Sequence, residues 1–167
     1  IGVVIYPRDA ENEEAIIQRA DTAMYYAKSM GRNRYAVFKK AMEKAVVRKH
    51  VLEKELRKAL AESRFIIRYQ PQNTQDGNKF IGAEALLRWS HPTEGIISPA
   101  EFIPIAEENH LIIPIGEWVL KQVCYQIKHW LEQHGHSPFI TVNLSAVQIR
   151  NSDLVNFIKK LLEQTKI

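Results

Sequence analysis

The chain has 167 residues, of which 46% are hydrophobic and 25% charged, and its formal net charge is +4 at pH 7. This composition excludes a disordered chain, and the length fits one soluble globular domain or parts of two. A membrane-spanning helix is also excluded, because no apolar run approaches the roughly 18 residues that such a helix needs. The single cysteine, Cys124, excludes an internal disulfide and a thiolate metal cluster, and we expect it to be a buried, inert thiol.

The first 40 residues alternate strand and helix patterns. Residues 1–7, IGVVIYP, predict a strand that ends at Pro7. From Asn12 to Met30, apolar and small residues recur at helical spacing, with Asn12 as the expected N-cap and a glycine just after the end. A second short strand is predicted over residues 34–38, RYAVF. Because the chain begins inside a strand-like run, we expect it to be a fragment of a longer protein.

A long amphipathic helix without proline or glycine is predicted from Lys39 to about Ser63. Residues 39–58 contain eight Lys and Arg but three Glu, so the positive charge of the chain is concentrated here. Two interpretations are a solvated linker face with intrahelical ion pairs and a nucleic-acid-binding helix. Because the rest of the chain is nearly neutral, we favour the linker and expect no nucleic-acid partner. The domain boundary is placed in the first half of this helix.

The remaining residues alternate strand and helix patterns. We predict strands over residues 64–72, 79–89 and 139–146. We predict helices over residues 99–109, 115–134 and 152–164. After an opening hairpin-like pair, this order is typical of a parallel α/β architecture. Trp118 and Trp130 are expected to be apolar anchors on their helix.

Polar side chains follow one face of each of the three strands. Because strand side chains alternate between faces, Glu84 and Arg88 point the same way, and Asn143 belongs to a polar file with Thr141 and Ser145. The first strand has its own polar file. Its members are Arg68, Gln70 and Gln72. A carboxylate and an amide are oxygen ligands for a hard cation such as Mg²⁺ or Mn²⁺, and an arginine binds phosphate. The alternative is a Glu84–Arg88 ion pair with Asn143 bonded to the backbone, and spacing alone leaves both open.

Several blocks of the chain closely resemble the first half of the EAL family, bacterial phosphodiesterases that linearise cyclic di-GMP. The blocks are YQPQ, GAEALLRW, SPAEFIPIAEENHLIIPIGEWVLKQVC and FITVNLSAVQI. The segment ADTAMYYAKSMGRNRYAVF is similar to the closing part of a GGDEF domain, the diguanylate cyclase fold. The resemblance implies a GGDEF tail over residues 1–40, a helical linker over 41–51 and the N-terminal half of an EAL domain over 52–167. The implied fold is α/β, an incomplete EAL-type TIM-like barrel preceded by the tail of an α+β GGDEF fold.

The resemblance also implies roles for individual residues. Glu84 matches the glutamate of the family's name motif, a catalytic metal ligand, and Asn143 matches a second metal ligand. Gln70, Leu86 and Arg88 match positions that line the dinucleotide site. The implied cofactor is Mg²⁺ or Mn²⁺, and the implied partner is cyclic di-GMP.

In the GGDEF-like segment, Lys28 and Arg32 match positions that hold nucleotide phosphates. An alternative stays open for both, namely surface charges near a helix end.

The expected activity is metal-dependent hydrolysis of cyclic di-GMP to the linear dinucleotide by a full-length bacterial signalling protein. We expect this fragment alone to be inactive, because the family takes further acidic ligands and a catalytic lysine from later strands. The alternative is a cyclic di-GMP receptor that binds without cleaving, and a third hypothesis is a module whose basic helix mediates dimerisation. An unclosed barrel would expose strand edges, so we expect a homodimer or a domain-exchanged oligomer. The expected location is cytoplasmic, while membrane anchoring of the parent stays open.

Overall fold

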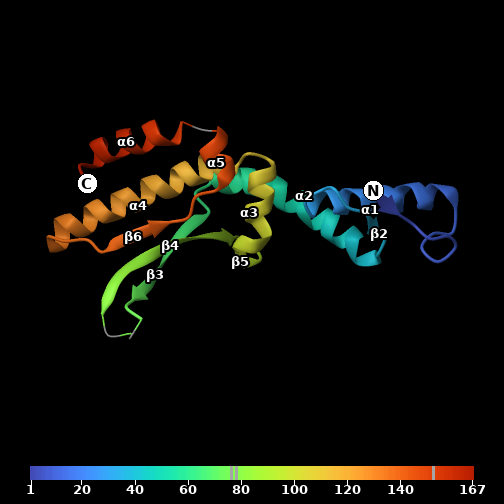
Figure 1. Ribbon diagram of the computed structural model, residues 1–167, viewed down its shortest axis with the longest axis horizontal. Helices are drawn as coiled ribbons and strands as arrows, with labels where there is room; N and C mark the ends of the chain where they lie inside the picture. Colours follow the sequence, from blue (N-terminus) through green and yellow to red (C-terminus); the bar gives the residue numbers. More distant parts are fainter. Residues whose placement is uncertain (76, 78, 152) are drawn as a thin grey trace. The chain divides into compact units, whose positions relative to one another are not determined.

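The computed structural model describes residues 1–75, 77, 79–151 and 153–167. The chain divides into two compact units, Ile1–Lys54 and Glu55–Ile167. The division falls within helix α2 (Lys40–Ala61). Figure 1 shows α2 as one long helix, and its bounds agree with the helix predicted from Lys39 to about Ser63.

The first unit pairs two short parallel strands, β1 (Gly2–Val3) and β2 (Ala36–Val37), with helix α1 (Glu13–Ser29). The predicted N-cap is confirmed, because the Asn12 side chain accepts a hydrogen bond of 2.9 Å from the Ala15 backbone. Buried residues of this unit form a hydrophobic cluster. Its members are Ala23, Phe38 and Met42.

The prediction of a strand over residues 1–7 was wrong beyond Val3. The chain turns instead, because the Asp9 backbone N–H donates to the Ile5 carbonyl at 2.7 Å. The Asp9 carboxylate also accepts from the Ile5 N–H at 3.0 Å. An aspartate side chain that bonds nearby backbone in this way competes with the strand ladder.

The second unit contains a four-stranded sheet centred on β4 (Phe80–His91). This strand pairs antiparallel with β3 (Phe65–Asn73) and β5 (Gly95–Ile97), and parallel with β6 (Phe139–Val142). The hairpin-like pair followed by a parallel crossover is therefore confirmed. Strand β5 was not predicted, since its three residues lie among turn-forming residues.

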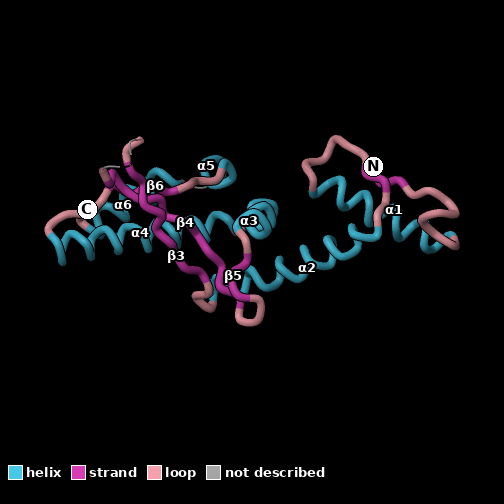
Figure 2. The backbone as a smooth tube through the Cα atoms, turned by 90° about the horizontal axis from the view of Figure 1, so that it is seen from below, coloured by secondary structure: helices cyan, strands magenta, loops and turns pink. Residues whose placement is uncertain are grey.

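In the residues that the structure describes, four helices follow or connect these strands. They are α3 (Pro99–Glu108), α4 (Ile112–His134), α5 (Ala146–Asn151) and α6 (Leu154–Thr165). Helix α4 packs against α3, α5 and α6, and Figures 1 and 2 show it running alongside the strands. Helix α5 was not predicted, because the strand was expected to continue to residue 146.

Aromatic contacts fix one face of the sheet against the helices. The Trp118 and Phe65 rings lie 6.0 Å apart, and the Trp130 and Tyr69 rings 5.2 Å apart. Trp89 of β4 is fully buried and meets the ring of Phe65 at 6.3 Å. Both tryptophans of α4 are therefore apolar anchors, as predicted. The side chains that alternate with these point to the opposite face of the sheet.

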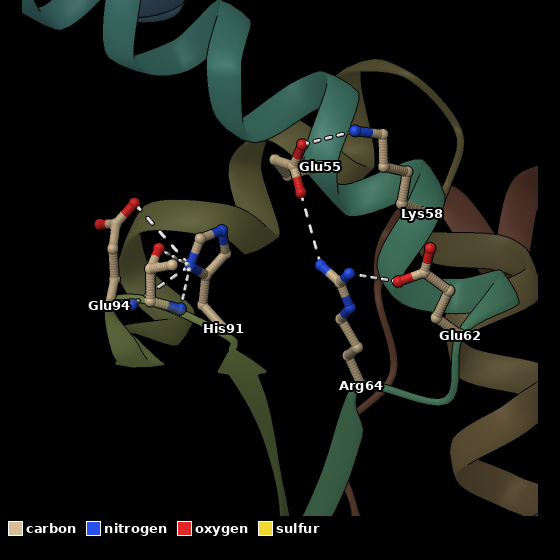
Figure 3. A network of polar contacts seen from close by, with 7 residues as sticks. Glu55, Lys58, Glu62, Arg64, His91 and Glu94 are labelled. Carbon is tan, nitrogen blue, oxygen red and sulfur yellow. Dashed lines mark hydrogen bonds and ion pairs between the residues drawn. The ribbon is translucent and has the colours of Figure 1, made fainter.

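A polar network joins the end of α2 to the start of β3 (Figure 3). The Glu55 carboxylate accepts a hydrogen bond of 2.8 Å from Lys58 and lies 3.4 Å from the Arg64 guanidinium. Arg64 also pairs with Glu62. The pKa of the Glu55 carboxyl is lowered, chiefly by the hydrogen bond from Lys58. One carboxylate thus connects the last turns of the helix to the first strand of the sheet.

Within the described part of the chain, no helix is both long enough and apolar enough to cross a bilayer.

Candidate functional site

The polar face of the sheet brings Glu84 and Gln70 side by side. Glu84 lies opposite Gln70 of β3 in the antiparallel register and opposite Thr141 of β6 in the parallel register. Glu84 is half-buried and Gln70 is exposed. The neighbours of Glu84 along the strand, Ala83 and Ala85, are buried on the helix-covered face. The alternation in GAEAL therefore directs the carboxylate away from the helices, as the sequence predicts.

Asn143 meets Glu84 directly. Its amide nitrogen donates a hydrogen bond of 2.6 Å to the Glu84 carboxylate. The alternative of a Glu84–Arg88 ion pair was wrong, because the Arg88 guanidinium instead donates to the Leu87 carbonyl at 2.9 Å. Among the residues that the structure describes, Glu84 and Arg88 form no ion pair. The carboxylate therefore contacts an amide, and its charge is not neutralised by that arginine.

The chemistry of this pair fits a hard divalent cation. Rotation of the Asn143 amide about its last side-chain bond would exchange nitrogen for oxygen, and both partners would then offer oxygen atoms to one ion. The pair supplies only two of the roughly six oxygen ligands that Mg²⁺ takes. In the described ranges, no group of three or more His, Cys, Asp or Glu residues is placed to hold a metal.

A cavity of about 270 Å³ is lined by Asn143 but not by Glu84. Leu86 and Arg88 of β4 line it together with Asn143, and residues of α3 and α4 close its other side. The structure thus brings together four of the five residues predicted for the EAL-like site, through the Glu84–Asn143 contact and this cavity. Gln70 joins them only as the cross-strand neighbour of Glu84.

The polar file predicted for the third strand was only partly right. Strand β6 ends at Val142, so Asn143 and Ser145 lie in the turn that follows it. The Ser145 hydroxyl donates at 2.7 Å to the carboxylate of Glu107 in α3, and does not line up with Thr141. Glu107 was missed as a residue of this region, since it appeared only as part of a helix pattern. The Ser-x-x-Gln pattern of residues 145–148 is typical of a helix start, and it would have predicted that the strand ends before Ser145.

Lys28 and Arg32 lie in the other compact unit, Ile1–Lys54. Lys28 is in the last turn of α1, and Arg32 follows it in a left-handed conformation with φ of 58°. Both residues are exposed.

Burial, full or partial, raises the pKa values of two groups near the helix layer. Burial raises the pKa of the Cys124 thiol, which keeps it protonated and supports the prediction of an inert cysteine. Burial also raises the pKa of the Tyr69 hydroxyl on the helix-covered face of β3. Neither group faces the Glu84–Asn143 pair.

Comparisons with known proteins relate the chain to a family. Residues 53–167 match the family model described as EAL domain. The bifunctional diguanylate cyclase/cyclic di-GMP phosphodiesterase MucR of Pseudomonas aeruginosa is 41% identical over 163 residues, which are 97% of this chain and 24% of that protein. The cyclic di-GMP phosphodiesterase PdeR of Escherichia coli is 38% identical over 164 residues, 98% of this chain and 24% of that protein. The chain therefore spans about a quarter of the length of these curated relatives.

A solved structure has a similar fold. The chain superposes on the PaMucR phosphodiesterase in complex with c-di-GMP with a TM-score of 0.66 and 41% identity, covering 70% of this chain and 47% of that one. The mixed α/β fold of the second unit is therefore that of an EAL domain, as predicted.

Proposed function

Because the chain belongs to the EAL domain family, we propose that the full-length protein hydrolyses cyclic di-GMP to the linear dinucleotide in bacterial second-messenger signalling. Two relatives of this chain, MucR and PdeR, are described as cyclic di-GMP phosphodiesterases. The solved MucR phosphodiesterase holds c-di-GMP.

The observation that carries the proposal is the contact between Glu84 and Asn143. The Asn143 amide nitrogen donates to the Glu84 carboxylate at 2.6 Å. Arg88, which carries a cationic group suited to a phosphodiester anion, lines a cavity together with Asn143. Asn143 therefore contacts the carboxylate that would hold a cation and shares a cavity with the arginine that would bind a phosphate.

In the proposed reaction, a water molecule attacks one phosphorus atom of cyclic di-GMP and one P–O bond of the ring breaks. A proton from the water ends on the departing sugar oxygen, and the other product end carries a terminal phosphate. A bound Mg²⁺ or Mn²⁺ supplies Lewis-acid chemistry, which lowers the pKa of water and withdraws charge from phosphoryl oxygens.

The chain's own residues would bind and orient the reactants. Glu84 and Asn143 hold the cation through their side-chain oxygens. Arg88 orients a phosphate through its N–H groups, while Leu86 and Gln70 line the dinucleotide site. Pre-positioning of this kind turns a reaction between separate molecules into one within a single complex.

We also propose that residues 1–40 are the tail of a GGDEF domain, that 41–51 are a helical linker, and that 52–167 begin the EAL domain. The description of MucR as a bifunctional cyclase and phosphodiesterase, with alignment over 97% of this chain, supports this order. Lys28 and Arg32 would then contact nucleotide phosphates in the complete cyclase domain.

Hydrolysis is tested by incubating the full-length protein with cyclic di-GMP and Mg²⁺ or Mn²⁺ and measuring the linear product by chromatography. We expect turnover by the wild type and none by Glu84→Ala. Glu132→Gln, an exposed carboxylate on α4, is the matched control and should keep wild-type turnover. Turnover that survives Glu84→Ala would refute the assignment of this ligand.

The alternative is a receptor that binds cyclic di-GMP without cleaving it. The favouring observation is that the Glu84–Asn143 pair provides few ligands, with no cluster of three His, Cys, Asp or Glu in the described ranges. Saturable binding with no linear product in the same experiment would support the receptor and contradict the phosphodiesterase.

A further inference from the structure

The turn that carries Asn143 is held by bonds outside the sheet. Strand β6 ends at Val142, one residue before Asn143, so the strand ladder does not fix the position of this amide. Helix α5 begins at Ala146 and is only six residues long. Isolated helices of that length are unstable in water, so other contacts must hold the turn in place.

The first of these contacts is a capping box. The Ser145 hydroxyl oxygen accepts a hydrogen bond of 3.0 Å from the Val147 backbone N–H. The Gln148 side-chain oxygen accepts one of 3.0 Å from the Ser145 backbone N–H. Such reciprocal bonding fixes the direction in which the chain enters a helix.

The second contact ties this box to helix α3. The Ser145 hydroxyl donates to the half-buried Glu107 carboxylate at 2.7 Å, and a hydrogen bond to an ionised acceptor is among the stronger ones. Because the same hydroxyl both donates to α3 and accepts from α5, Ser145 joins the two helices.

The third contact is close packing against helix α4. Gln148 is only 3% exposed, and a Cβ atom added at Gly116 would lie 1.8 Å from its amide nitrogen. The side chain of Gln148 therefore fits against bare backbone and has little room to move. The turn is thus held against α3 by the bond between Ser145 and Glu107, and against α4 by Gln148. Ser145 and Gln148 follow Asn143 by two and five residues along the chain.

From these contacts we propose that Glu107, Ser145 and Gln148 are positioning residues, which hold the Asn143 amide opposite Glu84 and so raise the affinity of the pair for a divalent cation. This inference rests on the proposed function. The three residues touch neither the cation nor the substrate in this account, and they act through Asn143. Removal of such supporting contacts around metal ligands typically weakens metal binding about 10- to 100-fold.

The test measures Mn²⁺ binding to the full-length protein by calorimetry, with no nucleotide present. We expect Ser145→Ala to raise the Kd for Mn²⁺ about tenfold. Ser145→Thr keeps the hydroxyl and should restore most of the affinity, a rescue that general destabilisation would not give. Ser137→Ala is the matched control, because Ser137 lies before β6 and donates to the neighbouring Pro138 carbonyl at 3.1 Å. This variant should bind Mn²⁺ like the wild type.

Failure of this inference and failure of the proposed function give different results. If the wild type binds Mn²⁺ and Ser145→Ala binds it with the same Kd, the inference alone is overturned. No Mn²⁺ binding by the wild type would overturn the cation site and the inference with it. If thermal melting shows that Ser145→Ala does not fold, Glu107→Ala removes the acceptor of the same hydrogen bond, and an unchanged Kd in that variant would equally overturn the inference.

Discussion

At the residue scale, the environment of Glu84 explains why this position needs a partner. The carboxylate is half-buried between buried alanines, and removing a charge from water is costly unless it is paired. Its closest contact is the Asn143 amide at 2.6 Å, which hydrogen-bonds the charge but does not neutralise it. A divalent cation would supply the missing positive charge. Alternation along the strand was enough to predict which way Glu84 points, but the Asn143 contact depends on a turn that the strand pattern did not reveal.

Arg88 gives a prediction at this scale. Loss of a hydrogen bond to a charged group costs roughly 1.5–3 kcal/mol, which corresponds to about a 10- to 100-fold change in affinity. We therefore expect Arg88→Ala to raise KM for cyclic di-GMP by about that factor. Arg88→Lys should show a smaller increase, since it keeps the charge but loses the fork of donors.

Steady-state kinetics of the full-length protein provides the measurement. Lys128→Ala is the control, because Lys128 lies on α4 and pairs only loosely with Glu132 at 3.9 Å. An Arg88→Ala variant with the wild-type KM would show that the guanidinium does not bind substrate.

At the element scale, long periodic segments were predictable and short ones were not. Helices α1 and α2 match the predicted spans within two residues, and α4 begins three residues earlier than predicted. Strand β5 and helix α5 were missed because three and six residues are too few for periodicity to appear. These short elements are stabilised by tertiary contacts, namely the pairing of β5 with β4 and the hydrogen bond from Ser145 to Glu107, and hydrophobic periodicity does not indicate either contact.

Gly82 supplies a prediction for the pairing of β4 with β6. A Cβ atom at this position would lie 2.3 Å from the Phe139 carbonyl oxygen, so the two strands would have to separate. Overpacking of this kind costs roughly 1–3 kcal/mol, and we expect Gly82→Ala to lower the free energy of unfolding by about that amount. Urea unfolding measures it, with Ser90→Ala, an exposed position on the same strand, as a control expected to change little. Equal stability of the two variants would contradict the close approach.

Glu55 supplies a prediction for the joint between α2 and β3 (Figure 3). The hydrogen bond from Lys58 lowers the pKa of Glu55, so the ionised carboxylate is favoured in the folded state. Its stabilisation is fully present above the unfolded pKa of about 4.3 and is lost as pH falls through the lower folded pKa. Glu55→Gln should therefore lower Tm at pH 7 and have a much smaller effect near pH 3. A difference in Tm between wild type and variant that stays constant over this range would contradict the prediction.

At the scale of the whole molecule, the sheet of the second unit leaves apolar groups exposed. Phe139 is 71% exposed, Phe80 54% and Ile81 52%. Apolar groups beside strand edges favour association with another chain. We propose that residues 1–167 on their own form a homodimer or a domain-exchanged oligomer.

Light scattering after gel filtration measures the molar mass of residues 1–167 and so tests this expectation. Urea unfolding at several protein concentrations is the second test. Association makes the unfolding midpoint depend on protein concentration. A monodisperse monomer of residues 1–167 that unfolds cooperatively at one midpoint would contradict the proposal.

The central claim is that Glu84 and Asn143 together bind one divalent cation. Anomalous scattering from Mn²⁺ in crystals of the full-length protein tests it most directly. The expected result is a peak within bonding distance of both a Glu84 carboxylate oxygen and the Asn143 amide oxygen, at about 2.1 Å as for Mg²⁺. A peak that lies elsewhere, or none between these two side chains in a crystal that has taken up Mn²⁺, would contradict the claim.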